Sequence, residues 1–532
     1  MNTPLQESAA KHTSFVWPGV ILAALLVGLG LRVWLLTLAP HTFFGDHFDN
    51  IGMGVTAEQY GLLKVYSVPV DKNPVISGPT YSWSSKRIHR VDRRVPRVAN
   101  YPPLAVTIFW LQAKSLYAID PKAQANTIFS RLWMAIIPVV FDLIMAIGVF
   151  LVGQNLAGQK GGIVAATVSW LFPPIMLDSA FWGQTDSWVL APTMLAIWFM
   201  LRRHWIAVGL VLGIASMLKP QTILLGPAVL FAAAILPRGE DSSALKAFAI
   251  RACKVTSSGL LIVAIIALPW IIADGLAWLQ QSYLNNLKMY PLTTLKAFNL
   301  WYLDALQLEA SSSARILDST VRVGPFTKDL WGHLLTLLSI PALAILCWHS
   351  YRKHAGLAVV LFTGLWLWST FVWPTRVHER YIVYCMPLII TATACLRRLW
   401  PAILVLAAVG TAEMTWYNWL NSFAGQMDRS RVRSTHMTNT RMRAGTSQAL
   451  STNHRHPFEV TSQAKTKMRK YYHEKLRPKE RPWEYLATIS LLLAYAYAVV
   501  LPFVRPVRTC HAILHKGARS PPGRQGLHKR RS

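Results

Sequence analysis

Residues 16–38 read VWPGVILAALLVGLGLRVWLLTL, an apolar stretch broken by a single arginine. A helix needs about 20 predominantly apolar residues to cross a bilayer, so this stretch is long enough to span one. It carries no small-residue cleavage site, and polar sequence follows it directly. We therefore expect a retained membrane anchor rather than a cleaved signal peptide.

Further apolar runs follow along the chain. Of all residues 53% are hydrophobic and 15% are charged, whereas about a quarter of a soluble protein's residues are charged. This hydrophobic content excludes a disordered chain, and five Cys, most of them in apolar runs, exclude a disulfide scaffold. We predict an all-α polytopic membrane protein with about 12 transmembrane helices. The runs lie near 128–152, 160–178, 187–201, 205–218, 221–236, 255–274, 330–347, 355–373, 382–396, 399–419 and 485–504.

The positive charge is concentrated late in the chain. Residues 428–484 and 505–532 together contribute more than half of the formal net charge of +30. Such segments attract anionic lipids, at about 1 kcal/mol for each basic residue near the membrane surface. We therefore expect membrane lipids as partners of these segments and no nucleic acid.

The positive-inside rule predicts the topology. Four basic connections are assigned to the cytoplasm: 202–204, 237–254, 351–354 and 397–398. This assignment requires that the short run 104–118, which contains Lys114, does not cross the membrane. The predicted organisation is a cytoplasmic tail (1–15), a transmembrane catalytic domain (16–420) with a first extracytoplasmic loop (40–103) that carries short helices, a basic polar loop (421–484), a last transmembrane helix (485–504) and a basic cytoplasmic tail (505–532).

The first loop opens with the sequence FFGDHFDN at residues 43–50. Asp46 and Asp49 are three residues apart and can share one helical face. A carboxylate in apolar surroundings can act as a general base, while helix capping and solvation are the ordinary alternative. The loop ends in Tyr101-Pro102-Pro103, where two prolines favour an extended entry into the next run.

The polar turn at 178–187 lies between two apolar runs. Trp182 and Gln184 are a common pairing for sugars, because an aromatic face stacks on C–H groups and an amide binds hydroxyls. Asp178 and Asp186 can orient a substrate or simply cap helices.

Two basic motifs follow. Lys219 is costly between two apolar runs unless it reaches an anion or extends to water. The sequence PTRVHERY at residues 374–381 places guanidinium groups beside a histidine and a glutamate. Guanidinium groups bind phosphate bidentately, so this motif is a candidate phosphate clamp, with salt bridges inside the loop as the alternative.

These elements, in this order, resemble the GT-C superfamily of membrane glycosyltransferases. The resemblance covers about residues 16–420 and is closer to the mannosyltransferases that add the second mannose to GPI anchors, and to their bacterial relatives, than to the glucosyltransferases of lipid-linked oligosaccharides. It rests on Gly45-Asp46, Tyr101-Pro102-Pro103-Leu104, 181–187, Lys219-Pro220-Gln221 and His378-Glu379-Arg380-Tyr381.

The resemblance implies a bundle that transfers a hexose, with inversion, from a polyprenyl- or dolichyl-phosphate sugar to a glycolipid or glycan. Asp46 would be the catalytic base. The implied donor site consists of Lys219, Arg376, His378, Glu379 and Arg380, and the implied orienting residues are Asp49, Tyr101, Asp178, Trp182, Gln184 and Asp186. No metal site and no cofactor are expected.

Two departures, Asn100 before Tyr101 and the absence of a His-rich loop at 181–184, favour mannose over glucose. The alternatives left open are a protein O-mannosyltransferase, a flippase or transporter of a lipid-linked glycan, and a structural or purely interacting membrane protein. A bacterial inner membrane is the expected location, with the endoplasmic reticulum as the alternative. All of these expectations require that the charged motifs gather on one side of the bilayer.

Overall fold

The structure is a computed structural model. It describes residues 4–38, 44–68, 99–123, 127–237, 243–285, 293–295, 297–306, 318–417 and 482–504. The basic loop 421–484, apart from its last three residues, and the tail 505–532 lie outside the described residues. The side chain of Asp46 also lies outside the description.

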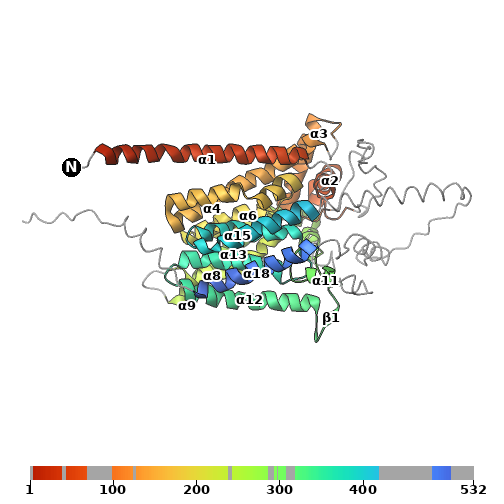
Figure 1. Ribbon diagram of the computed structural model, residues 1–532. Helices are drawn as coiled ribbons and strands as arrows, with labels where there is room; N and C mark the ends of the chain where they lie inside the picture. The colour runs from red at the N-terminus through yellow and green to blue at the C-terminus, as the bar shows by residue number, and fades with distance from the viewer. Residues whose placement is uncertain are drawn as a thin grey trace, which may run out of the picture.

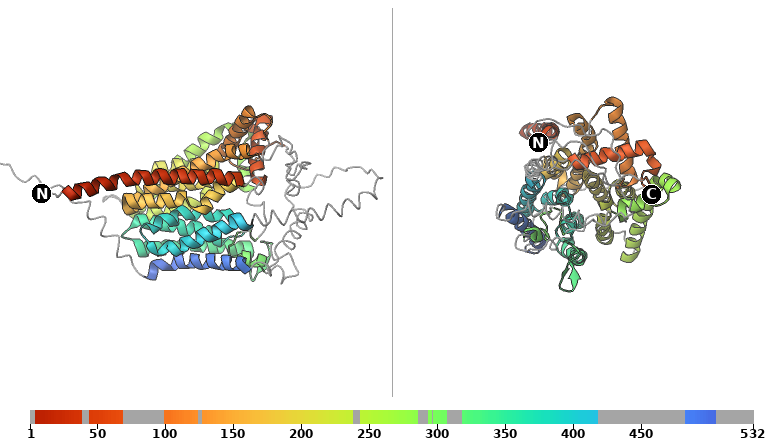
Figure 2. Two further views of the ribbon diagram at one scale, coloured as in Figure 1. Left: turned by 45° about the horizontal axis from the view of Figure 1, so that its top comes forward. Right: turned by 90° about the vertical axis from the view of Figure 1, so that its right-hand side faces the viewer.

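The described chain is a bundle of roughly parallel and antiparallel helices (Figures 1 and 2). Six of its helices are long and apolar enough to cross a membrane, which confirms the prediction of an all-α, multi-pass integral membrane protein. These six are α1 (Pro4–Leu38), α4 (Ile128–Trp170), α9 (Ala244–Asp274), α12 (Lys328–Tyr351), α13 (Ala355–Val372) and α18 (Pro482–Val504). The shorter helices of the bundle are α6 (Ser187–Leu201), α7 (Trp205–Leu218), α8 (Gly226–Ile235), α14 (Met386–Thr393) and α15 (Trp400–Ala412).

Helix α4 changes direction within its assigned length. Gly158 has φ 75° and ψ 176°, a conformation that a helix cannot contain and that glycine adopts readily. A Cβ built on Gly153 would lie 2.9 Å from the Cα of Gly162, so the segments on either side of the break fold back against each other. The separate runs predicted at 128–152 and 160–178 are thus the two arms of a hairpin.

The second arm stops before the end of its apolar run. It ends at Trp170 because Pro173 and Pro174, which lack N–H donors, start a new short helix, α5 (Pro173–Met176). A π-helix, η2 (Leu177–Trp182), continues from it and ends at Gly183, whose φ is 73°. This irregular segment carries the polar turn to the start of α6.

One end of the bundle collects the short basic connections. A Cβ on Gly356, near the start of α13, would contact Leu156 of α4 and Leu201 of α6. Tyr497 of α18 donates a hydrogen bond to the carbonyl oxygen of Arg398 at 3.0 Å. The connections at 202–204, 351–354 and 397–398 therefore lie together, and we call this the basic end.

The opposite end carries a layer of short helices (Figure 1). There α2 (Phe44–Tyr60) packs against α3 (Pro103–Ile119), the helix formed by the run 104–118. Pro102 is extended and Pro103 is the first residue of α3, as expected for Pro at a helix start. Helix α3 is not among the six candidate spans. We call this the site end.

The site end also contains the smaller elements. A two-stranded antiparallel hairpin, β1 (Arg322–Val323) and β2 (Phe326–Thr327), projects beside the start of α12 (Figure 2). The others are η1 (Leu62–Lys64), η3 (Pro220–Leu225), α10 (Ala277–Leu279), η4 (Gln280–Leu284), α11 (Tyr302–Leu306), η7 (Glu379–Cys385) and η9 (Glu413–Tyr417). At the basic end, η8 (Arg397–Leu399) precedes α15.

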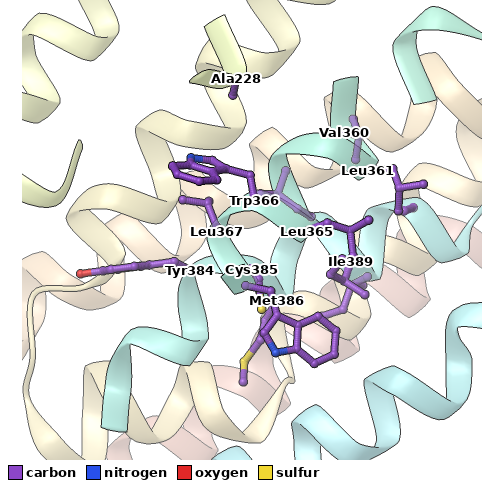
Figure 3. Close-up of a cluster of buried hydrophobic side chains, with 14 of the residues drawn as sticks. Ala228, Val360, Leu361, Leu365, Trp366, Leu367, Tyr384, Cys385, Met386 and Ile389 are labelled. Atoms are coloured by element: carbon purple, nitrogen blue, oxygen red, sulfur yellow. The ribbon is translucent and has the colours of Figure 1, made fainter. Parts of the chain in front are cut away.

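Helix α13 is the centre of the hydrophobic core. Of its apolar window 89% is buried, against 17% for α1, so α13 is enclosed by protein while α1 faces lipid on most sides. Figure 3 shows Leu365 and Trp366 of α13 packed among Ala228 of α8 and Met386 and Ile389 of α14. The same core extends to Tyr384, whose hydroxyl points away from the other labelled side chains in Figure 3.

Candidate binding site at one end of the bundle

The site is centred on the carboxylate of Asp186. The Nζ of Lys219 lies 2.5 Å from its Oδ1, the hydroxyl of Tyr384 donates to the same oxygen, and the Nε of Arg380 lies 3.3 Å from its Oδ2. Asp186 is fully buried and Lys219 is 2% exposed. Three segments far apart in sequence, the start of α6, the end of α7 and η7, thus meet at one carboxylate.

The local backbone explains how Lys219 reaches this point. It is the residue after α7 and is extended, with φ −150° and ψ 129°, because Pro220 disfavours the helical conformation at the preceding position. Its amide still closes the last turn of α7, and its side chain turns into the protein. The alternative that Lys219 extends to water is therefore excluded by its burial.

The side chain of Asp186 pairs with cationic side chains and does not cap a helix. It occupies the residue before α6, but its side chain makes no capping hydrogen bond. Burial alone would raise the pKa of this carboxyl. Lys219 and Arg380 outweigh that effect and hold the pKa of Asp186 below its ordinary value. Asp186 is therefore ionised at neutral pH and serves as a fixed anion between two cations.

Asp178 is the second buried carboxyl of the site. Its backbone carbonyl accepts a hydrogen bond from the amide of Gln184 at 2.9 Å, which closes the turn. Within the described residues, its Oδ1 and the hydroxyl of Thr185 have no hydrogen-bond partner. Burial, followed by the nearby charge of Asp186, raises the pKa of Asp178 well above its ordinary value. Burial thus favours the protonated form of Asp178 beside an ionised carboxylate.

Trp182 and Gln184, the pair predicted to bind sugar, are both buried. Trp182 is 4% exposed, and the guanidinium of Arg380 lies 5.4 Å from the centre of its ring. Gln184 is also buried. Both residues lie at the site, but one face of the indole is occupied by Arg380.

The residues of the motif at 378–381 contact one another and their neighbours at the site. Arg380 Nη1 lies 3.3 Å from His378 Nδ1, and that ring nitrogen lies 3.7 Å from Oε2 of Glu379. Tyr381 accepts a hydrogen bond from Gln221 at 2.9 Å and stacks on Tyr384. A parallel bridge joins His378 to Leu295 and holds the motif in place.

Arg376 does not join this cluster. Its guanidinium forms an ion pair with Asp329 at the start of α12. It also donates a hydrogen bond to the hydroxyl of Ser319 at 3.3 Å. Its φ of 63° is unusual for a residue other than glycine and turns the chain at this point. Of the five residues predicted to form a donor site, four lie at or beside the Asp186 cluster, and Arg376 pairs with α12 instead.

The first loop contributes its opening residues. His47 is buried, and a Cβ on Gly183 would lie 3.7 Å from its Nδ1, so α2 lies directly against the polar turn. Burial, and then the charge of Arg131, lowers the pKa of His47 to about 3. Asp49 is exposed, and Asp46 belongs to α2 with its side chain outside the described residues.

Tyr101 is connected to the site through aromatic packing. Its ring meets Phe109 edge-on at 5.4 Å, and Phe109 stacks on Trp188 of α6, also at 5.4 Å. Its carbonyl oxygen accepts a hydrogen bond from the hydroxyl of Tyr66 at 2.7 Å. Tyr101 therefore helps to fix α3 beside the start of α6.

Sequence reasoning missed two residues. Tyr384 lies one turn after Arg380, and its only signal was that spacing. Glu413 follows the apolar run of α15 as a lone acid, and it accepts a hydrogen bond from the amide of Phe298 at 2.6 Å. Burial raises the pKa of Glu413 well above its ordinary value. An isolated acid at the end of an apolar helix is the pattern that could have identified Glu413.

The chain is similar to one known family. The model of a family described as the GPI transamidase subunit PIG-U matches residues 66–303, which is less than half of the chain. The matched part contains Tyr101, Asp178, Trp182, Gln184, Asp186 and Lys219, while Asp46, Asp49 and the motif at 376–380 lie outside it. No curated protein matches the chain.

The expectation of a hexosyltransferase is wrong. Members of the matching family are described as subunits of the GPI transamidase. That assembly processes proteins and is not a hexosyltransferase. The side chain of Asp46, the predicted base, lies outside the described residues. At Asp186, Lys219 and Tyr384 both bind Oδ1, and the charges of Lys219 and Arg380 outweigh burial and lower the pKa. A carboxylate in that state is a weak proton acceptor.

Proposed function

We propose that the chain is a non-catalytic subunit of a membrane assembly that attaches GPI anchors, and that the Asp186 site binds the headgroup of a glycolipid for that assembly. The proposal takes the assembly from the similarity to the PIG-U family. It places the protein in the endoplasmic reticulum membrane, the second compartment that the sequence suggested.

The observation that carries the binding role is the composition of the cluster. Lys219 and Arg380 bring two positive charges to one ionised carboxylate, Asp186. The excess positive charge favours a phosphate-bearing headgroup, since guanidinium and ammonium groups form charge-assisted hydrogen bonds with phosphate oxygens. Asp178 Oδ1 and the Thr185 hydroxyl add polar atoms that suit sugar hydroxyls, because they lack partners within the described residues.

The same cluster supports a binding role over a catalytic one. A general base must have a free lone pair and a pKa near the working pH. Lys219 and Tyr384 both donate to Oδ1 of Asp186, whose pKa is lowered because Lys219 and Arg380 outweigh burial. Burial raises the pKa of the other carboxyl, Asp178, well above its ordinary value. The Asp186 site then binds the headgroup, while the acid–base chemistry falls to other subunits.

The test compares two buried lysines at the same end of the bundle. Lys219→Met removes a cation from the site, and Lys328→Met removes the lysine of the Lys328–Asp304 pair, which is also buried, with 2.8 Å between the charged atoms. The full chain is purified with its assembly, and the bound GPI glycolipid is quantified. We expect about a tenfold or larger loss for Lys219→Met, since a hydrogen bond to a charged group is worth about 1.5–3 kcal/mol. Lys328→Met should retain the lipid.

Two results would overturn separate parts of the proposal. Equal glycolipid content in the two variants removes the Asp186 cluster from binding. If the wild-type chain does not co-purify with any transamidase component, the proposal that it is a subunit of that assembly is wrong. Arg380→Gln, which keeps the side chain polar, provides a second site variant if Lys219→Met does not fold.

A further inference from the structure

A cavity of about 400 Å³ lies at the basic end, far from the Asp186 cluster. It is formed where α8 ends, α9 begins and α12 ends (Figure 1). Its wall is mainly apolar and includes Ile235, Leu236, Pro237 and Ala247. Trp348 forms its outer edge and is 43% exposed, so the cavity opens on the outside of the bundle.

Arg251 lines this cavity. Its guanidinium donates to the carbonyl oxygens of Ala233, Leu236 and Pro237 at 2.9, 2.8 and 2.8 Å. These bonds satisfy the carbonyl groups at the end of α8, which have no partner inside the helix. The guanidinium therefore holds α9 beside the end of α8 while a positive charge remains on the cavity wall.

The surroundings of the opening are basic. Within the described stretches 243–254 and 348–354 there are five Lys and Arg and no acid. Lys246 of α9 and Arg352 and Lys353, which follow α12, are exposed. Tryptophan is typical of the membrane–water interface, which places the opening near Trp348 at headgroup depth.

We propose that the cavity binds one acyl chain of an anionic phospholipid from the leaflet at the basic end, with the phosphate held by Lys246, Arg352 and Lys353. The apolar wall fits a hydrocarbon chain and the basic rim fits an anionic headgroup, so charge complementarity selects the occupant. A hydrocarbon chain also supplies the van der Waals contacts that an empty apolar cavity lacks. This site is independent of the glycolipid role proposed for the other end.

The first experiment fills the cavity. Ala247→Phe places a ring inside it, and Ala249→Phe places the same ring on the exposed side of α9 as a matched control. The full chain is purified from vesicles of phosphatidylserine and phosphatidylcholine, and retained lipid is measured by native mass spectrometry. We expect wild type and Ala249→Phe to retain one phosphatidylserine in preference to phosphatidylcholine, and Ala247→Phe to lose it at least fivefold.

The second experiment tests the rim without altering the cavity. Arg352→Gln/Lys353→Gln removes two charges near the opening, and Arg397→Gln/Arg398→Gln removes two exposed charges elsewhere at the same end. The first pair should lower phosphatidylserine retention about tenfold, and the second pair should leave it near wild type. Equal retention of the two lipids, or equal loss in the two pairs, overturns the proposal. Unchanged retention in Ala247→Phe overturns it independently.

Discussion

The Nζ of Lys219 lies 2.5 Å from Oδ1 of Asp186, and this contact joins the end of α7 to the start of α6 in the buried interior of the site end. A charge in such a place is tolerated only when it is paired. The pair therefore ties the site's charge balance to the packing of the bundle, and altering one partner affects both.

Removing Asp186 alone should destabilise the protein more than removing Asp186 and Lys219 together. Asp186→Asn leaves Lys219 and Arg380 buried with the anion gone, and we expect a loss of about 3–5 kcal/mol of stability. Adding Lys219→Met to that variant should restore part of the loss, because one of the uncompensated cations is gone. Thermal unfolding of the single and double variants in the same detergent gives the coupling energy. A double variant that is simply the sum of the singles would show that the two residues do not interact.

Helix α1 is joined to the bundle by a contact that leaves no space for a side chain at Gly28. A Cβ at this position would lie 2.0 Å from Nε1 of Trp170, whereas a Cβ on Gly30 would meet nothing within 4 Å. We expect Gly28→Val to destabilise the protein by about 1–3 kcal/mol, as overpacking does. Gly30→Val, two residues away on the same helix, should cost much less. Equal melting temperatures for the two variants would place α1 away from Trp170.

Acid should weaken the docking of α2 through His47. The pKa of His47 is lowered from 6.5 to about 3 in the folded protein by burial and by Arg131. The unfolded chain therefore binds a proton between these values that the folded chain does not, and stability is lost as the pH falls from about 6.5 toward 3. His47→Gln should flatten this part of the stability curve between pH 7 and pH 5. An identical slope in the variant would show that His47 does not stay neutral in the folded protein.

The sequence allowed the fold class and much of the site to be predicted, because both depend on local patterns. Apolar runs of spanning length predict helices, and isolated charges at their ends, such as Lys219 and Asp186, stand out against them. That these charges meet at one end follows from the alternating direction of successive helices. In the structure, Trp182, Asp186, Lys219 and Arg380 lie together.

The rest depends on contacts that no local pattern encodes. Arg376 pairs with Asp329 rather than with the site, because the chain turns at its positive φ. Tyr384 and Glu413 are single polar residues whose partners lie more than a hundred positions away. The hexosyltransferase activity was mispredicted because it came from a likeness of motifs, and such a likeness does not fix function.

The ion pair between Arg32 and Asp142 has a consequence for how the protein is made. Arg32 donates two hydrogen bonds to Oδ2 of Asp142, at 2.8 and 3.0 Å. It also donates to the carbonyl oxygen of Trp170, and its guanidinium lies over the Trp170 ring. During synthesis the arginine enters the membrane long before its carboxylate partner. Until α4 has been inserted, the first helix carries an uncompensated charge in lipid, which disfavours its stable residence there. Nascent chains that stall before residue 142 should therefore be the ones that quality control extracts and degrades.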